Sequence, residues 1–380
     1  MPDRARPGLR RPPRALPFLV SVVGTRPEAI KMAPVARALA GLAGARHEVV
    51  LTGQHDGLAG HFDPGQRLRQ LRFDPAGRSV ESLGEALRAL LRGRFRRQRI
   101  DLVLVHGDTT SALAGALAAR DCGIAVAHVE AGLRSFDLCQ PWPEEGHRIA
   151  IDAVAELLFA PTDRAARNLR REGRASGRIL VTGNSGIDAL LQARARIAGP
   201  RQPTDSGRRL ILATCHRREN QGVPALAVCG ALRRMVRELP VRVAAPLHPN
   251  PATRRGVETA LAGIPFVELL EPQGHEAMVR LIDSSWLILT DSGGLQEEAP
   301  ALGRPVLVLR EVTERPEAVA SGNLELVGTD PDRLFAAVSG LLADERKYAR
   351  MARPAFPFGD GRASERIAGA IAAWLAERKR

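Results

Sequence analysis

The chain has 380 residues, of which 44% are hydrophobic and 26% are charged, a composition typical of globular proteins with enough chain for two or three domains. This balance excludes collagen-like, wholly disordered and small disulfide-bonded proteins, and no apolar run reaches the ~20 residues of a membrane-spanning helix, so we expect no membrane partner. The formal net charge is +13, but only 4% of the residues are aromatic, which leaves few rings to stack on bases and argues against a nucleic-acid partner.

The chain begins with a basic segment. Residues 1–17 contain five arginines and one aspartate without any apolar pattern, so we predict a disordered basic tail. No apolar stretch of signal-peptide character precedes a cleavage site. The four cysteines of the whole chain form no CxxC pair, which indicates a reducing, cytoplasmic location and no structural metal site.

Short apolar runs alternate with amphipathic segments from residue 18 onward. The run FLVSVVG (18–24) leads into a segment with helical spacing over 28–40. Fully apolar strands between helices indicate a parallel sheet covered on both faces, and we assign a first Rossmann-like domain to residues 18–190. Its further strands are expected at 48–52, 101–107, 124–130, 157–161 and 179–183, with helices near 110–120, 146–156 and 163–172.

The same pattern restarts after a Pro/Gly/Ser-rich segment at 198–209. We predict a second Rossmann-like domain over 191–362 and a C-terminal helix within 363–380 that packs back on the first domain. The fold class is therefore α/β, with two doubly wound domains and an active site in the cleft between them. Strands of the second domain are expected at 210–214, 241–247, 266–270, 286–290 and 305–309.

Charged residues follow the strands of the first half. Arg26 and Lys31 lie at the start of the first helix, where the helix N-terminus already favours an anion. Asp108 and Glu130 directly follow two strands, and Glu144 lies in the proline-flanked segment PWPEEGHR. Either strand-end carboxylate alone would be explained as a helix cap. Carboxylates that share one cleft, however, separate their pKa values and supply both an acid and a base.

Small and cationic residues follow strands of the second half. His216 follows its first strand, beside two arginines. After the strand WLILT, small residues open a helix whose backbone N–H groups can approach a phosphate directly. Glu298 lies within the same helix, suited to binding ribose hydroxyls, and Arg315 adds a cation. We therefore predict a nucleotide-diphosphate site, but not a nicotinamide site or a P-loop, because neither GxGxxG nor GxxxxGK[ST] occurs. The small residues are Ser292, Gly293 and Gly294.

Several long blocks of the chain resemble one enzyme family. The blocks GTRPEAIKMAPV (24–35), HGDTTSALAGALAA (106–119), HVEAGLRS (128–135) and TDSGGLQEEAPALGRPVLVLREVTERPEAV (290–319) are similar to those of the non-hydrolysing UDP-N-acetylglucosamine 2-epimerases, in order over about residues 18–375. The resemblance implies a GT-B-like architecture, a homodimer and the interconversion of UDP-GlcNAc and UDP-ManNAc for polysaccharide biosynthesis. It also implies that no added cofactor is needed.

The resemblance also implies roles for single residues. It makes Asp108, Glu130, Glu144 and His216 catalytic. It makes the following residues part of the substrate site: Arg26, Lys31, Gln273, Ser292, Gly293, Gly294, Glu298 and Arg315. Gln54, His55, Arg217 and His248 match motifs that form a second, activating UDP-GlcNAc site in bacterial members. The sequence departs from the family at 56–58, where Asp-Gly-Leu replaces Arg-Glu-Met, at Cys215, which is often glycine, and at Met278, which is often aromatic.

The implied reaction explains these residue types. The C2–H of the sugar has no neighbouring carbonyl to acidify it, and oxidation at C3 would need the missing nicotinamide site. The other route expels UDP from C1, so that a carboxylate removes the C2 proton and a 2-acetamidoglucal forms; UDP then re-adds while a proton enters the other face of C2. The alternatives are a 2-epimerase of a modified UDP-sugar of the diacetamido-uronate type, a hydrolysing relative that releases free ManNAc, a GT-B glycosyltransferase, and a nucleotide-sugar or nucleic-acid binder without turnover.

Overall fold

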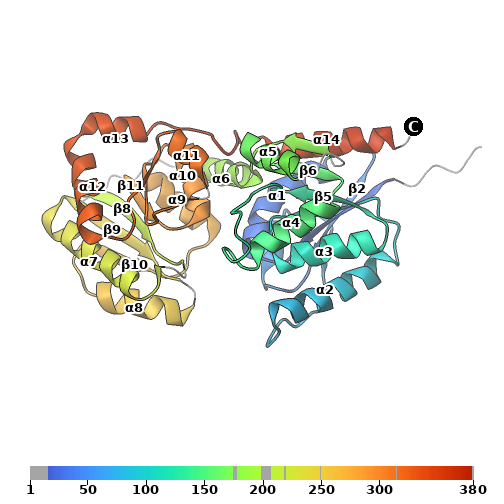
Figure 1. Ribbon diagram of the computed structural model, residues 1–380, viewed down its shortest axis with the longest axis horizontal. Helices are drawn as coiled ribbons and strands as arrows, with labels where there is room; N and C mark the ends of the chain where they lie inside the picture. The colour runs from blue at the N-terminus through green and yellow to red at the C-terminus, as the bar shows by residue number, and fades with distance from the viewer. Residues whose placement is uncertain are drawn as a thin grey trace, which may run out of the picture.

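The computed structural model of the protein describes residues 16–173, 178–197, 207–217, 220–248, 250–313 and 315–378. Most of the expected basic tail (1–17) and of the Pro/Gly/Ser-rich segment (198–209) lies outside these residues. Figure 1 shows two lobes, one built from the blue-to-green half of the chain and the other from the yellow-to-orange half. None of the described helices is long and apolar enough to cross a membrane.

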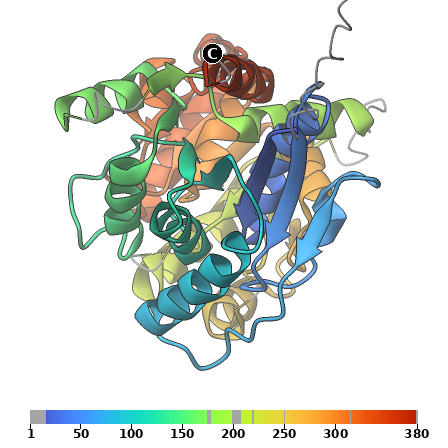
Figure 2. The same cartoon turned by 90° about the vertical axis from the view of Figure 1, so that its right-hand side faces the viewer.

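The first lobe contains a sheet of seven parallel strands in the order β3-β2-β1-β4-β5-β6-β7. Figure 2 shows the cyan and teal helices to one side of the blue strands of this sheet. The strands are β1 (Phe18–Val23), β2 (Arg46–Leu51), β3 (Leu68–Gln70), β4 (Leu102–His106), β5 (Ala125–Val129), β6 (Leu157–Ala160) and β7 (Arg178–Val181). The helices are α1 (Arg26–Ala40), the short η1 (Leu58–His61), α2 (Val80–Phe95), α3 (Thr110–Asp121), α4 (Glu144–Val154), α5 (Asp163–Arg171) and α6 (Ser185–Arg196).

The second lobe contains a sheet of six parallel strands in the order β10-β9-β8-β11-β12-β13. The strands are β8 (Arg209–Thr214), β9 (Val241–Pro246), β10 (Val267–Leu270), β11 (Leu287–Thr290), β12 (Val306–Val308) and β13 (Leu324–Leu326). Its helices are α7 (Val223–Glu238), α8 (Pro251–Leu261), α9 (His275–Ser284), α10 (Gly293–Ala301), α11 (Pro316–Ala320), α12 (Pro331–Ala343) and α13 (Glu345–Met351). The chain then returns to the first lobe as α14 (Ala363–Glu377).

Both sheets reverse their strand order at a central pair. The reversal lies between β1 and β4 in the first sheet and between β8 and β11 in the second. Such a switch point leaves a crevice at the carboxyl ends of the strands, where α/β proteins bind ligands. Two doubly wound α/β units are therefore confirmed.

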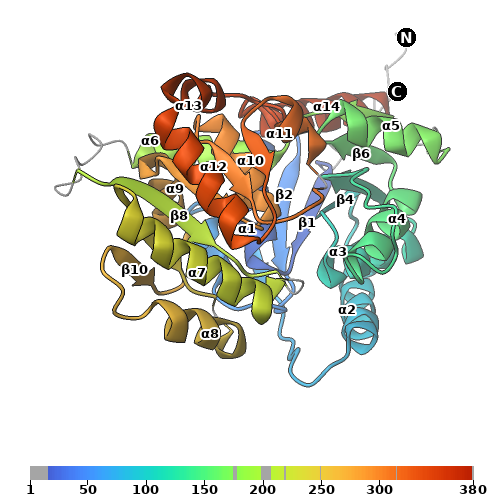
Figure 3. The same ribbon diagram turned by 60° about the vertical axis from the view of Figure 1, so that its left-hand side comes forward.

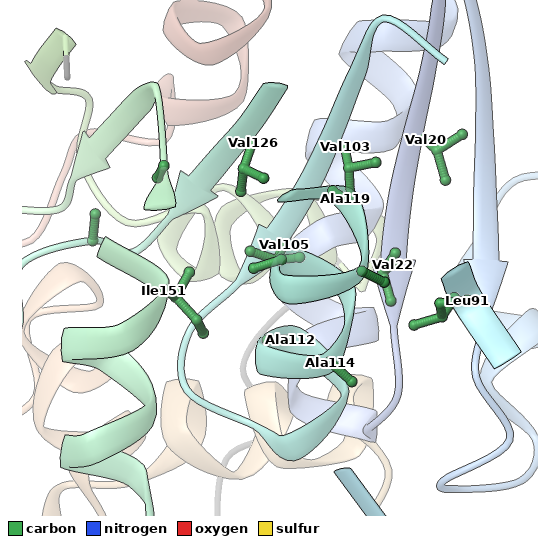
Figure 4. Close-up of a cluster of buried hydrophobic side chains, with 14 of the residues drawn as sticks. Val20, Val22, Leu91, Val103, Val105, Ala112, Ala114, Ala119, Val126 and Ile151 are labelled. Atoms are coloured by element: carbon green, nitrogen blue, oxygen red, sulfur yellow. The ribbon is translucent and has the colours of Figure 1, made fainter. Parts of the chain in front are cut away.

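The first sheet is buried on both faces. Val20, Val22, Val103 and Val105 point to one face and pack against α2, α3 and α4, for example against Ile151 (Figure 4). The alternate residues of the same strands pack against α1 on the opposite face. Because successive side chains of a strand point to opposite faces, burial on both faces requires the continuous apolar runs seen in the sequence.

The last helix lies on the first lobe. In Figure 3, α13 and α14 run along the top of the molecule from the second lobe toward the first. Ile371 and Trp374 of α14 share a core with Met32 and Leu39 of α1, and the Trp374 indole N–H donates to Glu156 Oε1 at 2.7 Å. The division of the chain at 190/191 stays a prediction, and it would fall within α6.

Candidate active site

A partly buried ion pair lies at the carboxyl end of β5. Lys31 Nζ donates to Glu130 Oε2 at 2.5 Å, and His106 Nε2 lies 3.2 Å from the same oxygen. Burial alone would raise the pKa of Glu130, but the charges of Lys31 and His106 outweigh it and hold that pKa well below its usual value. Glu130 has a φ of 69°, a backbone conformation that non-glycine residues rarely adopt and that is often found at functional sites.

A second carboxylate–cation pair lies beside it. Arg148 on α4 donates to Asp108 Oδ2 from Nε at 2.8 Å and from Nη2 at 2.6 Å. His147 Nδ1 donates to the backbone carbonyl of Asp108 at 2.8 Å. The loop after β4 is thus fixed from two successive residues of α4.

The neighbouring glutamates at the start of α4 have different surroundings. Glu145 Oε1 accepts from the backbone N–H groups of Ser135 and Phe136 at 3.1 and 3.0 Å, so this residue shapes the loop after β5. Glu144 Oε2 is buried and has no hydrogen-bond partner among the described residues. A buried carboxylate oxygen without a partner is costly unless a ligand supplies one.

A fully buried network supports both strand-end loops from behind. His128 on β5 bonds the Gly107 carbonyl through Nε2 at 2.8 Å and Asp152 Oδ1 through Nδ1 at 2.6 Å. Arg134 Nη2 donates to Asp152 Oδ2 at 2.7 Å. Although burial would raise the pKa of Asp152, the charges of His128 and Arg134 lower it below its usual value. The network therefore fixes the position of Gly107, just before Asp108, relative to the strand β5 and the loop after it, where Glu130 lies.

In the second lobe, the start of α10 forms a cradle of small residues under a guanidinium. Ser292 precedes the helix, and Gly293 and Gly294 are its first residues. Arg315 Cζ lies 3.0 Å from the position that a Cβ on Gly293 would occupy. Glu297 holds Arg315 there, because Nε donates to Glu297 Oε1 at 2.8 Å. The first backbone N–H groups of a helix and an adjacent cation suit an anionic ligand.

The two lobes meet at these groups. Asn184, which precedes α6, donates to Glu297 Oε2 at 2.8 Å. The pKa of Lys31 is raised, since Glu130 and Glu297 together outweigh both burial and the opposing charge of Arg315. The pKa of Arg148 is also raised, because Asp108 outweighs burial. The charge of Arg315 acts in the opposite direction and lowers this pKa. The carboxylates of the first sheet and the cradle of the second therefore act on one another across the cleft.

His216 lies in the loop after β8. The backbone N–H groups of His216 and Arg217 both donate to Asp291 Oδ2 at 2.9 Å, and Asn220 Nδ2 donates to the same oxygen at 2.9 Å. The His216 ring centroid lies 5.2 Å from that of His248. Burial lowers the pKa of His216, and the opposing charge of Asp291 only partly offsets it, which favours the neutral ring.

Glu298 lies half-buried on α10. Burial and the charge of Glu297 raise its pKa to about 7, against an opposing effect of Lys31. Gln273 lies in the loop between β10 and α9, and its Nε2 donates to the Glu271 carbonyl at 2.6 Å. The adjacent Gly274 and His275 line a cavity of about 340 Å³ whose other wall includes residues of α1.

The structure separates the remaining predicted residues into two groups. Arg26 is exposed at the start of α1. The pKa of His55 is lowered mainly by burial and further by the charge of Arg26. Gln54 Oε1 accepts from Ser111 Oγ at 2.7 Å, beside the same turn. Arg217 and His248 instead lie beside His216. In the described part of the chain, no hydrogen bond or ion pair joins Gln54 or His55 to Arg217 or His248.

Sequence reasoning missed several residues that shape the site: Glu28, His106, Asn184, Asp291 and Glu297. Glu28 accepts from the Gly24 and Thr25 N–H groups at 2.9 and 2.7 Å, which fixes the turn after β1. Asp291 follows a strand directly, and this signal could have identified it. No set of His, Cys, Asp and Glu side chains within the described ranges could hold a metal ion.

Comparison with known proteins identifies the family. The family model for UDP-N-acetylglucosamine 2-epimerase matches residues 37–372. The UDP-N-acetylglucosamine 2-epimerase of Escherichia coli K12 is 41% identical over 379 residues, covering 93% of this chain and 98% of the relative. The structure of the UDP-GlcNAc 2-epimerase from Neisseria meningitidis bound to UDP-GlcNAc superposes with a TM-score of 0.87 at 36% identity, covering 94% of this chain and 100% of that chain.

A more distant structure shares the fold alone. The glycosyltransferase of kitacinnamycin has a TM-score of 0.64 at 13% identity and covers 95% of this chain and 100% of its own. The GT-B-like architecture expected from the sequence is thereby confirmed. With its family model, its close relatives and its fold in agreement, the chain belongs to the UDP-N-acetylglucosamine 2-epimerase family.

Proposed function

We propose that the protein interconverts UDP-GlcNAc and UDP-ManNAc by eliminating UDP to a 2-acetamidoglucal and adding it back. The observation that carries this proposal is the arrangement across the cleft: the carboxylates Asp108, Glu130 and Glu144 on one side, and the α10 cradle with Arg315 on the other. The reaction needs acids and bases at C2 and cations at a leaving diphosphate, and these groups supply both.

The first step breaks the C1–O bond, and its electron pair leaves on the terminal phosphate oxygen of UDP. Backbone N–H groups at Gly293 and Gly294 and the Arg315 guanidinium stabilise the charge that develops there. His216 donates a hydrogen bond to the diphosphate. The electron deficiency at C1 makes the C2 proton acidic, a carboxylate takes it, and the C1=C2 double bond forms.

The second step reverses these changes on the other face. A second acid returns a proton to C2, and the retained UDP oxygen attacks C1. Asp108 and Glu130 each have a fixed cationic partner, and the lowered pKa of Glu130 suits a base. Glu144 has a buried oxygen without a partner in the described chain, and we assign it the proton transfer on the opposite face.

The other predicted residues fit the remainder of the substrate. Glu298 binds the ribose hydroxyls, Gln273 lies at the uracil, and Arg26 and Lys31 contribute positive charge to the first-lobe side of the cleft. We extend the proposal to a cytoplasmic homodimer in which Gln54, His55, Arg217 and His248 bind a second, activating UDP-GlcNAc. Light scattering tests the dimer, and a sigmoidal dependence of rate on UDP-GlcNAc, lost in His55→Ala, tests the activation.

Two alternatives make different predictions for the same site. A 2-epimerase of a diacetamido-uronate UDP-sugar would use the same carboxylates on another substrate. A GT-B glycosyltransferase, the class of the kitacinnamycin enzyme with which the fold is shared, needs an acceptor and would leave C2–H in place. Its donor cradle would resemble the α10 start, but it would not need several carboxylates around C2.

One experiment separates these functions. The protein is incubated with UDP-GlcNAc in D₂O, and the products are followed by NMR. UDP-ManNAc with deuterium at C2 is the expected result, and Asp121→Asn, an exposed aspartate on α3, serves as the control variant that should behave like wild type. Free ManNAc would instead identify a hydrolase. Unchanged substrate without exchange would overturn the proposal in favour of a modified sugar, a transferase or a binder.

A further inference from the structure

Glu297 lies at the centre of a hydrogen-bonded chain that joins the two lobes, Asn184–Glu297–Arg315. We call this chain the relay. Glu297 is only 4% exposed, and both of its carboxylate oxygens are occupied: Oε1 accepts from Arg315 Nε and Oε2 from Asn184 Nδ2, each at 2.8 Å. Carboxylate hydrogen bonds to a guanidinium and an amide of this length are strong and directional. Glu297 therefore cannot reach a ligand itself, although the neighbouring Glu298 can.

Asn184 is itself fixed from several sides. Its Oδ1 accepts from the Gly186 N–H at 2.8 Å and thereby caps α6, and its backbone N–H donates to the Phe358 carbonyl at 2.6 Å. The side chain is 2% exposed. With the cap fixing Oδ1, the amide Nδ2 has one direction left, toward Glu297. The end of the first sheet thus sets the position of a carboxylate in the second lobe.

Lys31 adds a second cation to the same carboxylate. A Cβ on Gly186 would lie 3.4 Å from Lys31 Cε, so the lysine packs on the α6 start next to Asn184. The charge of Glu297 also helps to raise the pKa of Lys31. Glu297 consequently sits between two cations, Arg315 at the cradle and Lys31, which binds Glu130.

We propose that Asn184 and Glu297 are positioning residues that hold Arg315 over Gly293, so that the diphosphate cradle is complete only when the first lobe is docked against the second. This inference rests on the proposed function, because it takes UDP as the ligand of the cradle. Without the Asn184 amide, Glu297 loses one of its two anchors, and the Arg315 side chain can leave the helix start. The relay would then act on UDP affinity through Arg315 alone.

The test is a double-mutant cycle on UDP binding, measured by isothermal titration calorimetry. Asn184→Ser keeps an N-cap oxygen for α6 but removes the amide donor to Glu297, and Arg315→Gln removes the guanidinium. We expect Asn184→Ser alone to weaken UDP binding about tenfold, as for one hydrogen bond to a charged group, and to have almost no further effect in the Arg315→Gln background.

Thr162→Ala is the matched control. It removes another helix cap and another hydrogen bond between the lobes, from Thr162 Oγ1 to Glu317 Oε1 at 3.0 Å. It tests a bond to α11, the helix that begins after Arg315, but leaves the Asn184–Glu297 and Glu297–Arg315 bonds in place. Its UDP affinity should stay near that of wild type. Equal losses in Thr162→Ala and Asn184→Ser, or additive effects of Asn184→Ser and Arg315→Gln, would refute the relay.

Turnover separates this inference from the proposed function. If wild type binds UDP and epimerises UDP-GlcNAc but the cycle is additive, the relay is wrong and the function stands. If the cycle is coupled but no UDP-ManNAc forms, the function is wrong and the relay stands. If wild type does not bind UDP, both are wrong.

Discussion

The half-buried Glu298 should make the ligand-free protein less stable as the pH rises. Burial and the charge of Glu297 raise its folded-state pKa from 4.5 to about 7, so the folded protein binds this proton more tightly than the unfolded chain does. Stability is therefore lost between about pH 4.5 and about pH 7, and the loss is complete above that range. Because a tenfold difference in proton affinity is worth about 1.4 kcal/mol, the upper limit of the loss is roughly 3.5 kcal/mol.

Glu298→Gln removes the titrating group and keeps the shape. At about pH 5 both proteins are neutral at this position and should unfold at similar temperatures, whereas at about pH 9 the variant should unfold at a higher temperature. Scanning calorimetry without UDP measures the difference, and Glu85→Gln, at an exposed position of α2, controls for a general loss of charge. A difference between Glu298→Gln and wild type that does not change with pH would refute the reasoning.

Four further substitutions test single features of the site. Asp108→Asn and Glu144→Gln should each lower kcat by about 10²–10⁴ with unchanged circular dichroism, and near-normal rates in both would contradict their proposed roles. Gly293→Ala places a Cβ 3.0 Å from Arg315 Cζ and should weaken UDP binding about tenfold without a change in melting temperature; wild-type affinity would show that the guanidinium is not part of the cradle. Lys31→Met removes the nearer of the two cationic partners of Glu130 and leaves only His106. It should lower stability by up to about 3–5 kcal/mol, measured by urea unfolding, and an unchanged midpoint would show that the pair is not structural.

Much of the fold could be predicted because its central strands are buried on both faces. Strands such as Leu102–His106 consist of consecutive apolar residues, and this pattern is distinctive. The segment between residues 53 and 100 received no assignment, although it contains β3 and α2. The edge strand Leu68–Gln70 is short and mostly polar, and α2 buries only Leu87, Leu91 and Phe95. An edge strand and a helix with one narrow buried stripe give weak signals.

The candidate site was predictable where a residue follows a strand directly. Asp108, Glu130 and His216 were found this way, because strand ends in a parallel sheet lie at the crevice. His106 and Glu297 could not be found, since His106 lies within a strand and Glu297 looks like any buried helix residue. Their importance comes from contacts with Glu130 and Arg315, which lie far away in the sequence. Only the packed structure brings such partners together.

The cations of the site are already paired with carboxylates of the protein, and a bound UDP diphosphate would compete for them. Glu130 is paired with Lys31, and Glu297 with Arg315, so the diphosphate competes with carboxylates for the same cations. As the cations turn to the phosphates, the pKa values of nearby carboxylates should rise, most visibly that of Glu298, which already lies at about 7. We therefore expect UDP binding at about pH 8, where a phosphate with a second pKa of ~6 is fully ionised, to take up protons. Calorimetric titration in buffers of different ionisation enthalpy measures this uptake, which should shrink in Glu298→Gln. Binding enthalpies that are equal in all buffers would mean that the acids keep their cations when the nucleotide binds, and that the cradle draws its charge from elsewhere.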